Sequence, residues 1–331
     1  MSFQNTTKLM VKNLANKFGI APVRLEHLKR ILKENAELAE ILKVIEQDHN
    51  NHRNKLANLS EKGLTFYYNE IHGPSFQLHK SKNRNKVLIC SIPKCGTYLA
   101  AEVLKSFGFI DTNVQLWQDF LHDYRGQTVE NKRADVLPTQ IDLKLSESLE
   151  LIHPGQFSLG HFPCTLENKT LFEKFKVIYI YRNLRNSCVS MMRFADELKP
   201  ESHWFMKGEW QQNQDKKIKF LEFLKSHGER YFNWIKPITE WFNEPGLLTV
   251  SYEDLTGTNG TSIQNRIYLK LNNFLDVESN TFSGGPTNAT NTKTMTSTGQ
   301  PSNYEHYWSD ETESVFKKLG FYELNKSLGY D

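Results

Sequence analysis

The sequence predicts an α/β protein built on a parallel sheet, and three features of its 331 residues lead to this prediction. Apolar runs of strand length recur along the chain, each run is continuous rather than alternating, and segments of helical periodicity separate them. Strands buried on both faces have this character, because helices cover both sides of a parallel sheet. We therefore expect residues 86–331 to form a domain with a central parallel sheet and helices on both faces.

The N-terminal region, residues 1–80, is expected to be a helical extension packed on this domain. Apolar residues recur at a helical period from Pro22 to Asp48, and a shorter helix is expected from Leu9 to Phe18, where Gly19 ends it. An arm that binds a partner or forms a dimer is the alternative.

The main domain is expected to begin with a strand, a tight loop and a helix. The apolar run 86–93 leads into Lys94, Cys95, Gly96 and Thr97, and a helical pattern continues from Tyr98 to Phe107. Gly96 permits a tight bend, and the amides that open the helix can bind an anion together with the helix dipole. Lys94 adds a cation and Thr97 a hydroxyl donor. An ordinary strand-to-helix turn is the alternative.

Two further strands are expected in the main domain. Phe175–Tyr181 runs into a helical segment, Leu184–Phe194, and Leu247–Tyr252 follows an aromatic helix, Ile218–Phe242. The last long segment, at about 280–303, consists almost entirely of Gly, Ser, Thr, Asn and Pro. Loops of this length in compact domains are either functional lids or disordered, and we expect a lid.

The loop at Lys94 is not the GxxxxGK[ST] loop of nucleoside-triphosphate enzymes, because its Lys precedes the Gly. The strand that ends at Tyr181 is followed by Arg182, where a kinase needs an acidic ligand for Mg²⁺. The sequence therefore favours an anionic ligand that is held without a metal.

Composition excludes several other classes of protein. The formal net charge is only +3, which does not indicate nucleic-acid binding. No stretch approaches the roughly 20 apolar residues that span a membrane, and the N-terminus lacks the apolar core of a signal peptide. The four cysteines form no CxxC pair, so neither a disulfide framework nor a zinc site is expected. We expect a soluble, cytoplasmic protein.

Four segments, in order, resemble the sulfotransferases that use 3′-phosphoadenosine 5′-phosphosulfate (PAPS). IPKCGTYL (92–99) resembles the PKSGTTWL loop, which holds the 5′-phosphosulfate in that family. VIYIYRNLRNSCVSMMRF (177–194) resembles the signature YVYRNPKDVAVSYYHF, whose Arg and Ser hold the 3′-phosphate; here these are Arg182 and Ser190. GHFP (160–163) resembles THLP and makes His161 the catalytic His. SYEDL (251–255) resembles the segment whose Tyr, here Tyr252, lies near the adenine.

The sequence departs from the family pattern at several positions. Cys95 replaces a Ser of the loop, and Leu99 replaces the Trp that stacks on adenine, with Tyr98 as a possible substitute. Leu159 replaces a Lys near the catalytic His. The RKG that grips the 3′-phosphate becomes Ser297, Thr298 and Gly299, with Lys293 or Arg185 as candidate compensating cations. The family's dimerisation segment is not recognisable, so a homodimer stays open.

The resemblance implies transfer of a sulfuryl group from PAPS to a hydroxyl, or less readily an amine, of a small-molecule metabolite, leaving PAP (adenosine 3′,5′-bisphosphate). His161 would be the general base, and Lys94 would stabilise the leaving phosphate. The cofactor site would comprise Lys94, Cys95, Gly96, Thr97, Tyr98, Arg182, Ser190, Tyr252, Ser297, Thr298 and Gly299. An ATP-dependent small-molecule kinase and a non-catalytic PAP-binding protein are the alternatives.

The acceptor is expected to enter between residues 116–124, 130–153 and 194–210. These segments combine aromatic residues such as Trp117, Phe120 and Trp210 with carboxylates such as Asp119 and Asp196. Such a pocket would suit a flat or cationic small molecule. Ordinary helix faces are the alternative.

Overall fold

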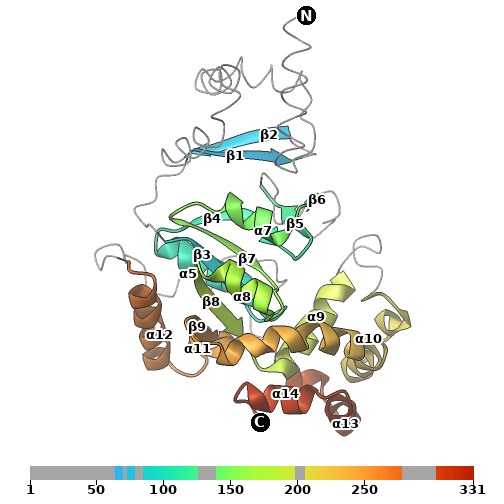
Figure 1. Cartoon of the computed structure of the whole chain (residues 1–331). Coiled ribbons are helices and arrows are strands. Elements are labelled where there is room, and N and C mark those ends of the chain that lie inside the picture. Colours follow the sequence, from blue (N-terminus) through green and yellow to red (C-terminus); the bar gives the residue numbers. More distant parts are fainter. Residues whose placement is uncertain (1–63, 70–72, 79–84, 126–138, 198–205, 278–302) are drawn as a thin grey trace, which may run out of the picture.

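A computed structural model describes residues 64–69, 73–78, 85–125, 139–197, 206–277 and 303–331. Its centre is a seven-stranded sheet with the order β6-β5-β4-β7-β3-β8-β9 (Figure 1). The strands from β4 to β9 in this order run parallel, and β5 and β6 extend one edge antiparallel. The strands of this sheet are β3 (Val87–Ser91), β4 (Ile110–Leu116), β5 (Phe120–Asp123), β6 (Gln140–Asp142), β7 (Gln156–Gly160), β8 (Lys176–Tyr181) and β9 (Leu248–Ser251).

Helices cover both faces of this sheet. The α-helices are α5 (Thr97–Ser106), α7 (Leu145–Ser148), α8 (Leu166–Phe172), α9 (Leu184–Glu197), α10 (Lys216–Thr239), α11 (Tyr252–Thr256), α12 (Thr261–Phe274), α13 (Asp310–Lys318) and α14 (Phe321–Ser327). Short 3₁₀ turns are η2 (Leu149–Leu151), η4 (Glu209–Gln212), η5 (Glu240–Asn243) and η7 (Tyr304–Tyr307). Among the described helices, none is long and apolar enough to cross a membrane.

The central strands divide the core into two layers. Side chains alternate along a strand, so Val87 and Ile89 of β3 pack with α5 and α12, whereas Leu88 and Cys90 pack with α9, α10, α13 and α14. Every residue of β3 and β7 is buried, which explains why these strands are continuous apolar runs.

Side-chain caps fix where several helices begin. Asp215 accepts hydrogen bonds from the amides of Lys217 and Ile218 at the start of α10. Thr165 and Ser309 cap α8 and α13 in the same way, through the amide three residues further on. The long helix α10 therefore starts at a defined residue. Its buried aromatic residues Phe220, Phe223 and Tyr231 lie in the same core layer as α9, α13 and α14.

The predicted sheet is confirmed for the strands that become β3, β8 and β9, and so are the helices that follow as α5 and α9. The structure adds β4 to β7, two of which make the edge antiparallel. The helices expected at 9–18 and 22–48 lie outside the described residues, as does the lid loop. Within the predicted helical extension, the structure instead describes an antiparallel hairpin, β1 (Leu64–Asn69) and β2 (Gly73–Leu78).

Candidate functional site

The four segments singled out in the sequence follow four neighbouring strands. His161 comes after β7, residues 92–96 after β3, Arg182 after β8 and Tyr252 after β9. These strands are consecutive in the sheet and parallel, so all four segments leave its carboxyl edge side by side. Ligands of open α/β sheets bind at this edge. The fold thus gathers residues that lie up to 160 positions apart in the chain.

Gly96 fixes the shape of the loop after β3. Its φ of 99° lies in the left-handed region, and it is the N-cap residue immediately before α5. A Cβ at this position would lie 2.4 Å from Cδ2 of Tyr252, so the tyrosine ring lies directly against the loop. Lys94 also has a positive φ, 66°, which is uncommon for a residue with a side chain. The loop is therefore a tight cradle with the amino end of α5 open beside it.

The loop after β3 is anchored by the core layer that contains α9 and α10. Ser187 on α9 donates a hydrogen bond to the carbonyl oxygen of Pro93 at 2.9 Å, and the hydroxyl of Tyr231 on α10 donates to the same oxygen at 3.0 Å. Thr97 reaches Ser91 at 2.6 Å between the hydroxyl oxygens, so its hydroxyl points beneath the loop. These contacts hold the loop in one conformation before any ligand binds.

Cys95 is a packing residue of this loop rather than a nucleophile. Its side chain is fully buried, with Sγ 3.7 Å from Oγ of Ser187. Burial raises the pKa of the Cys95 thiol to about 12, while the hydrogen bond to Ser187 and the charge of Arg182 oppose this increase. The thiol therefore stays protonated at neutral pH.

His161 has a defined tautomer. Its Nδ1 lies 2.8 Å from the carbonyl oxygen of Ser91, which can only accept, so Nδ1 carries the proton and Nε2 carries the lone pair. Burial, together with the charge of Lys94, lowers the pKa of His161 to about 4, although the hydrogen bond to Ser91 opposes the shift. At neutral pH the ring is uncharged, and Nε2 can accept a proton.

Aromatic rings form a wall around His161. The rings of Trp117 and Trp234 meet it edge-on, with centroid distances of 5.8 and 6.0 Å. The two indoles stack on each other at 5.8 Å, and Phe120 stacks on Trp117 at 5.4 Å. Trp117, Phe120 and Trp234 are all partly exposed, so this aromatic wall offers apolar surface beside the base.

The two predicted cations rest on aromatic rings. Nζ of Lys94 lies 3.9 Å from the ring centre of Phe194 on α9. The guanidinium of Arg182, only 5% exposed, lies 4.1 Å above the ring of Tyr252, and its Nε is 3.9 Å from a carboxylate oxygen of Glu253. Tyr330 donates a 2.6 Å hydrogen bond to the other oxygen of Glu253, which fixes this carboxylate behind Arg182.

The structure does not gather every predicted site residue. The hydroxyl of Tyr98 donates to Gln115 on β4 at 3.1 Å, which places it on the other side of β3 from Arg182 and Tyr252. Ser190 lies partly exposed on α9. Arg185 is engaged by both carboxylate oxygens of Glu313, at 3.0 and 3.3 Å. Residues 293 and 297–299 lie outside the described residues.

Several residues of the site had not been singled out from the sequence. Ser91, Ser187 and Tyr231 hold the loop and the base, and Trp234 completes the aromatic wall. Ser187 lies within the second motif, which was a usable signal, but α10 carried no motif at all. In the described part of the chain, no three His, Cys, Asp or Glu side chains are grouped so that they could hold a metal ion.

Comparison with known proteins gives one family and several solved structures. The family model described as "Sulfotransferase domain" matches residues 84–318. The crystal structure of mouse sulfotransferase SULT7A1 complexed with PAP aligns with 75% of this chain and 89% of its own, at 15% identity and a TM-score of 0.45. Retinol dehydratase in a complex with retinol and PAP aligns with 82% and 94%, at 15% identity and a TM-score of 0.38. Among curated proteins, none matches the chain.

Proposed function

The chain belongs to the sulfotransferase family, and from this premise we propose that it transfers a sulfuryl group from PAPS to a hydroxyl group of a small molecule. The observation that carries the proposal is the convergence of Lys94, His161 and Arg182 at the carboxyl edge of adjacent parallel strands. Two cations and a neutral base at one edge suit an anionic donor and a hydroxyl acceptor.

The residues of the loop fit the phosphate groups of a nucleotide. The amides at the start of α5 and the helix dipole attract anions, and Gly96 leaves no side chain between them and a ligand. Lys94 would contact the 5′-phosphosulfate, and Arg182 and Ser190 would hold the 3′-phosphate. Tyr252, which lies against both Gly96 and Arg182, would contact the adenine.

His161 would accept the proton of the acceptor hydroxyl at Nε2. PAPS, when bound, supplies the sulfuryl group and a phosphate leaving group. The hydrogen bond from Nδ1 to Ser91 holds the imidazole in the tautomer that can act as a base. Lys94 lies near enough to lower the pKa of His161, so the cation and the base can act on the same reacting group. Lys94 would stabilise the negative charge that develops on the leaving phosphate.

The aromatic wall favours a flat, uncharged acceptor such as a phenol or a planar alcohol. Trp117, Phe120 and Trp234 present ring surface beside the base. Asp196, one of the carboxylates considered for a cationic acceptor, is paired with Lys219 at 2.8 Å. Asp119 is exposed rather than enclosed. We therefore expect Asp119→Asn and Asp196→Asn to leave the acceptor KM unchanged.

The test is transfer of label from ³⁵S-PAPS to a panel of phenols and planar alcohols at neutral pH, in the presence of EDTA. We expect a labelled product and a loss of about 10²–10⁴-fold in kcat for His161→Gln, the usual contribution of a general base. His306→Gln, at an exposed position on η7, is the matched control. Full activity in His161→Gln would remove the base from this account. In a parallel assay without EDTA, phosphoryl transfer from labelled Mg-ATP in place of sulfuryl transfer from PAPS would establish a kinase.

A further inference from the structure

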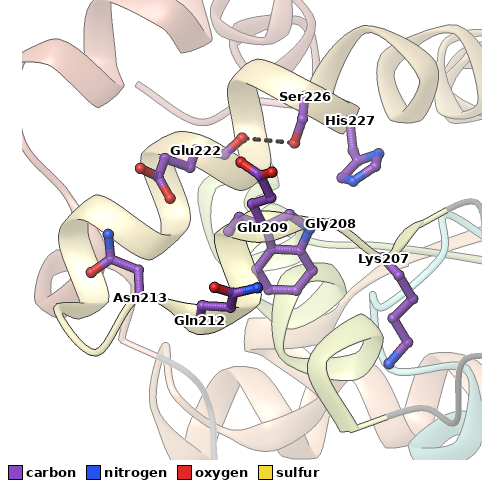
Figure 2. A pocket seen from close by; sticks show the side chains of 9 residues that line it. Lys207, Gly208, Glu209, Gln212, Asn213, Glu222, Ser226 and His227 are labelled. Atoms are coloured by element: carbon purple, nitrogen blue, oxygen red, sulfur yellow. Dashed lines mark hydrogen bonds between the residues drawn. The ribbon is translucent and has the colours of Figure 1, made fainter.

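A second hollow opens between η4 and α10 and has a volume of about 720 Å³ (Figure 2). None of its nine lining residues is among the residues gathered at the sheet edge, and Trp210, which the sequence suggested for the acceptor pocket, lines this hollow instead. The lining residues are Lys207, Gly208, Glu209, Trp210, Gln212, Asn213, Glu222, Ser226 and His227. This volume is in the range of pockets that hold small molecules.

Two buried nitrogen atoms border the same space in this hollow. Nε1 of Trp210 and Nε2 of His227 have no hydrogen-bond partner among the residues that the structure describes. A Cβ built on Gly208 would lie 3.3 Å from Nε1 of Trp210 and 3.7 Å from Nε2 of His227. Gly208 has an extended backbone, with φ 178°, which any residue can adopt. A glycine is therefore needed here because of the limited space and not because of the backbone conformation. Because Gly208 has no side chain, the two nitrogens border one small space beside its backbone.

The two nitrogens have opposite hydrogen-bonding roles. An indole N–H can only donate. His227 forms a hydrogen bond to the backbone of Lys207, and because Nε2 has no partner, this bond comes from Nδ1–H. Nε2 therefore carries a lone pair and accepts. Burial and the charge of Arg230 lower the pKa of His227, which keeps it in this neutral form. A hydroxyl group, which accepts and donates at once, matches this pair.

Trp210 is held rigidly enough to act as a fixed donor. Its side chain is only 2% exposed, and its ring meets Phe223 edge-on with centroids 5.0 Å apart. Buried polar atoms without partners are rare in folded proteins, because each one costs free energy that a ligand or an ordered water would recover. The pair thus indicates a bound group at this position.

The rim of the hollow is rich in groups that bind further hydroxyls. Carboxylates come from Glu209 and Glu222, and amides from Gln212 and Asn213, all of which line the hollow (Figure 2). Lys207 directs its Nζ to the carbonyl oxygen of Ala195 at 2.8 Å, so its charge is engaged there. The two carboxylates disfavour an anion. We propose that this pocket is a second ligand site that binds an uncharged polyhydroxylated molecule such as a sugar, with one hydroxyl between Trp210 and His227.

The experiment is a titration of the full chain, labelled with ¹⁵N in its tryptophans, with glucose and with tetrahydropyran. Tetrahydropyran has the same six-membered ring without hydroxyl groups. The indole signal of Trp210 is identified as the one that moves in His227→Gln. We expect glucose to shift this signal saturably and tetrahydropyran to leave it in place. The indole of Trp241, which already donates to Phe162 at 2.9 Å, is the internal control and should stay unchanged.

Substitutions of His227 test whether glucose binds through the acceptor atom Nε2 of this residue. His227→Phe keeps a ring but removes the acceptor, and it should weaken glucose binding by about three- to tenfold, the range of one hydrogen bond. His227→Gln, which retains an acceptor, should bind within about threefold of the original chain. Equal shifts with glucose and tetrahydropyran, or no saturable shift with glucose, would overturn the proposal and leave an ordered water as the partner of these atoms.

Discussion

His161 combines a fixed orientation with an unusually low pKa. The carbonyl of Ser91 holds Nδ1–H, and burial keeps the ring neutral far below its ordinary pKa of about 6.5. A base of this kind is ready to accept a proton at every physiological pH. The same burial makes the imidazolium costly, so a neighbouring anion such as a bound phosphate would favour its formation.

The pH dependence of the reaction follows from this shift. The base works when it is neutral, so kcat/KM should be constant near neutrality and should fall as the pH drops through the pKa of His161. Because that pKa is lowered to about 4, we expect the acid limb to lie well below pH 6.5. A pH–rate profile from pH 4.5 to 8 shows whether the rate stays constant above this limb. An acid limb centred at or above pH 6.5 would contradict the assignment of this buried histidine as the base.

Arg182 is the residue on which nucleotide affinity should depend most. We expect Arg182→Ala to weaken PAP binding by about 10- to 150-fold, because a charge-assisted contact contributes about 1.5–3 kcal/mol. Calorimetry of PAP binding measures this change. Arg266→Ala, an exposed arginine of α12, removes the same charge and should bind PAP normally. Equal affinities of the two variants would show that the 3′-phosphate is held elsewhere.

At the scale of elements, the loop after β3 is fixed by three different parts of the chain. The hydroxyls of Ser187 on α9 and Tyr231 on α10 hold the Pro93 carbonyl, and Tyr252 at the start of α11 lies against Gly96. A loop held in this way loses little conformational entropy when a ligand binds.

Gly96 and Gly246 offer a matched test of this packing. Both have a positive φ, 99° and 86°, but only Gly96 faces a neighbour, since a Cβ on Gly246 would meet nothing within 4 Å. Gly246→Ala should lower the free energy of unfolding by about 1–2 kcal/mol through backbone strain. Gly96→Ala should add about 1–3 kcal/mol from the clash with Tyr252 and should weaken PAP binding, whereas Gly246→Ala should not. Urea denaturation and calorimetry measure both effects. Equal losses of stability would mean that the tyrosine ring moves away freely.

The sequence predicted those elements whose local pattern is strong. Strands β3, β8 and β9 are continuous apolar runs and were predicted within one or two residues. Strands β5 and β6 have only four and three residues, too few for a periodic signal. In β4 the pattern is broken, because Asn113 has a φ of 54° and the pairing register shifts between Asp111 and Gln115. Such irregularities carry no signal in a single sequence.

The residues of the candidate site likewise fall into those that the sequence indicated and those that it did not. Lys94, His161, Arg182 and Tyr252 each follow a strand, and the structure brings them to one sheet edge, while their roles there stay predictions. The stacking of Trp117 on Trp234 joins residues of β4–β5 and α10, and no local pattern encodes a contact over that separation. The helices expected before residue 64 and the loop near residue 299 lie outside the described residues and stay predictions.

For the whole molecule, the sheet order is what creates the site. The strands β7, β3, β8 and β9 place His161, the loop at Lys94, Arg182 and Tyr252 in sequence along one edge, while two core layers hold the strands from either side. The central claim is that this edge binds a 3′,5′-bisphosphate nucleotide. That claim can be tested without knowledge of the acceptor.

The most direct measurement is a calorimetric titration of the full chain with PAP, with ADP and Mg-ATP as controls. We predict selective binding of PAP with micromolar or tighter affinity and no requirement for Mg²⁺. Preference for Mg-ATP would contradict the sulfotransferase assignment of the site and favour a kinase, and binding of none of the three would mean that this edge of the sheet does not hold the nucleotide.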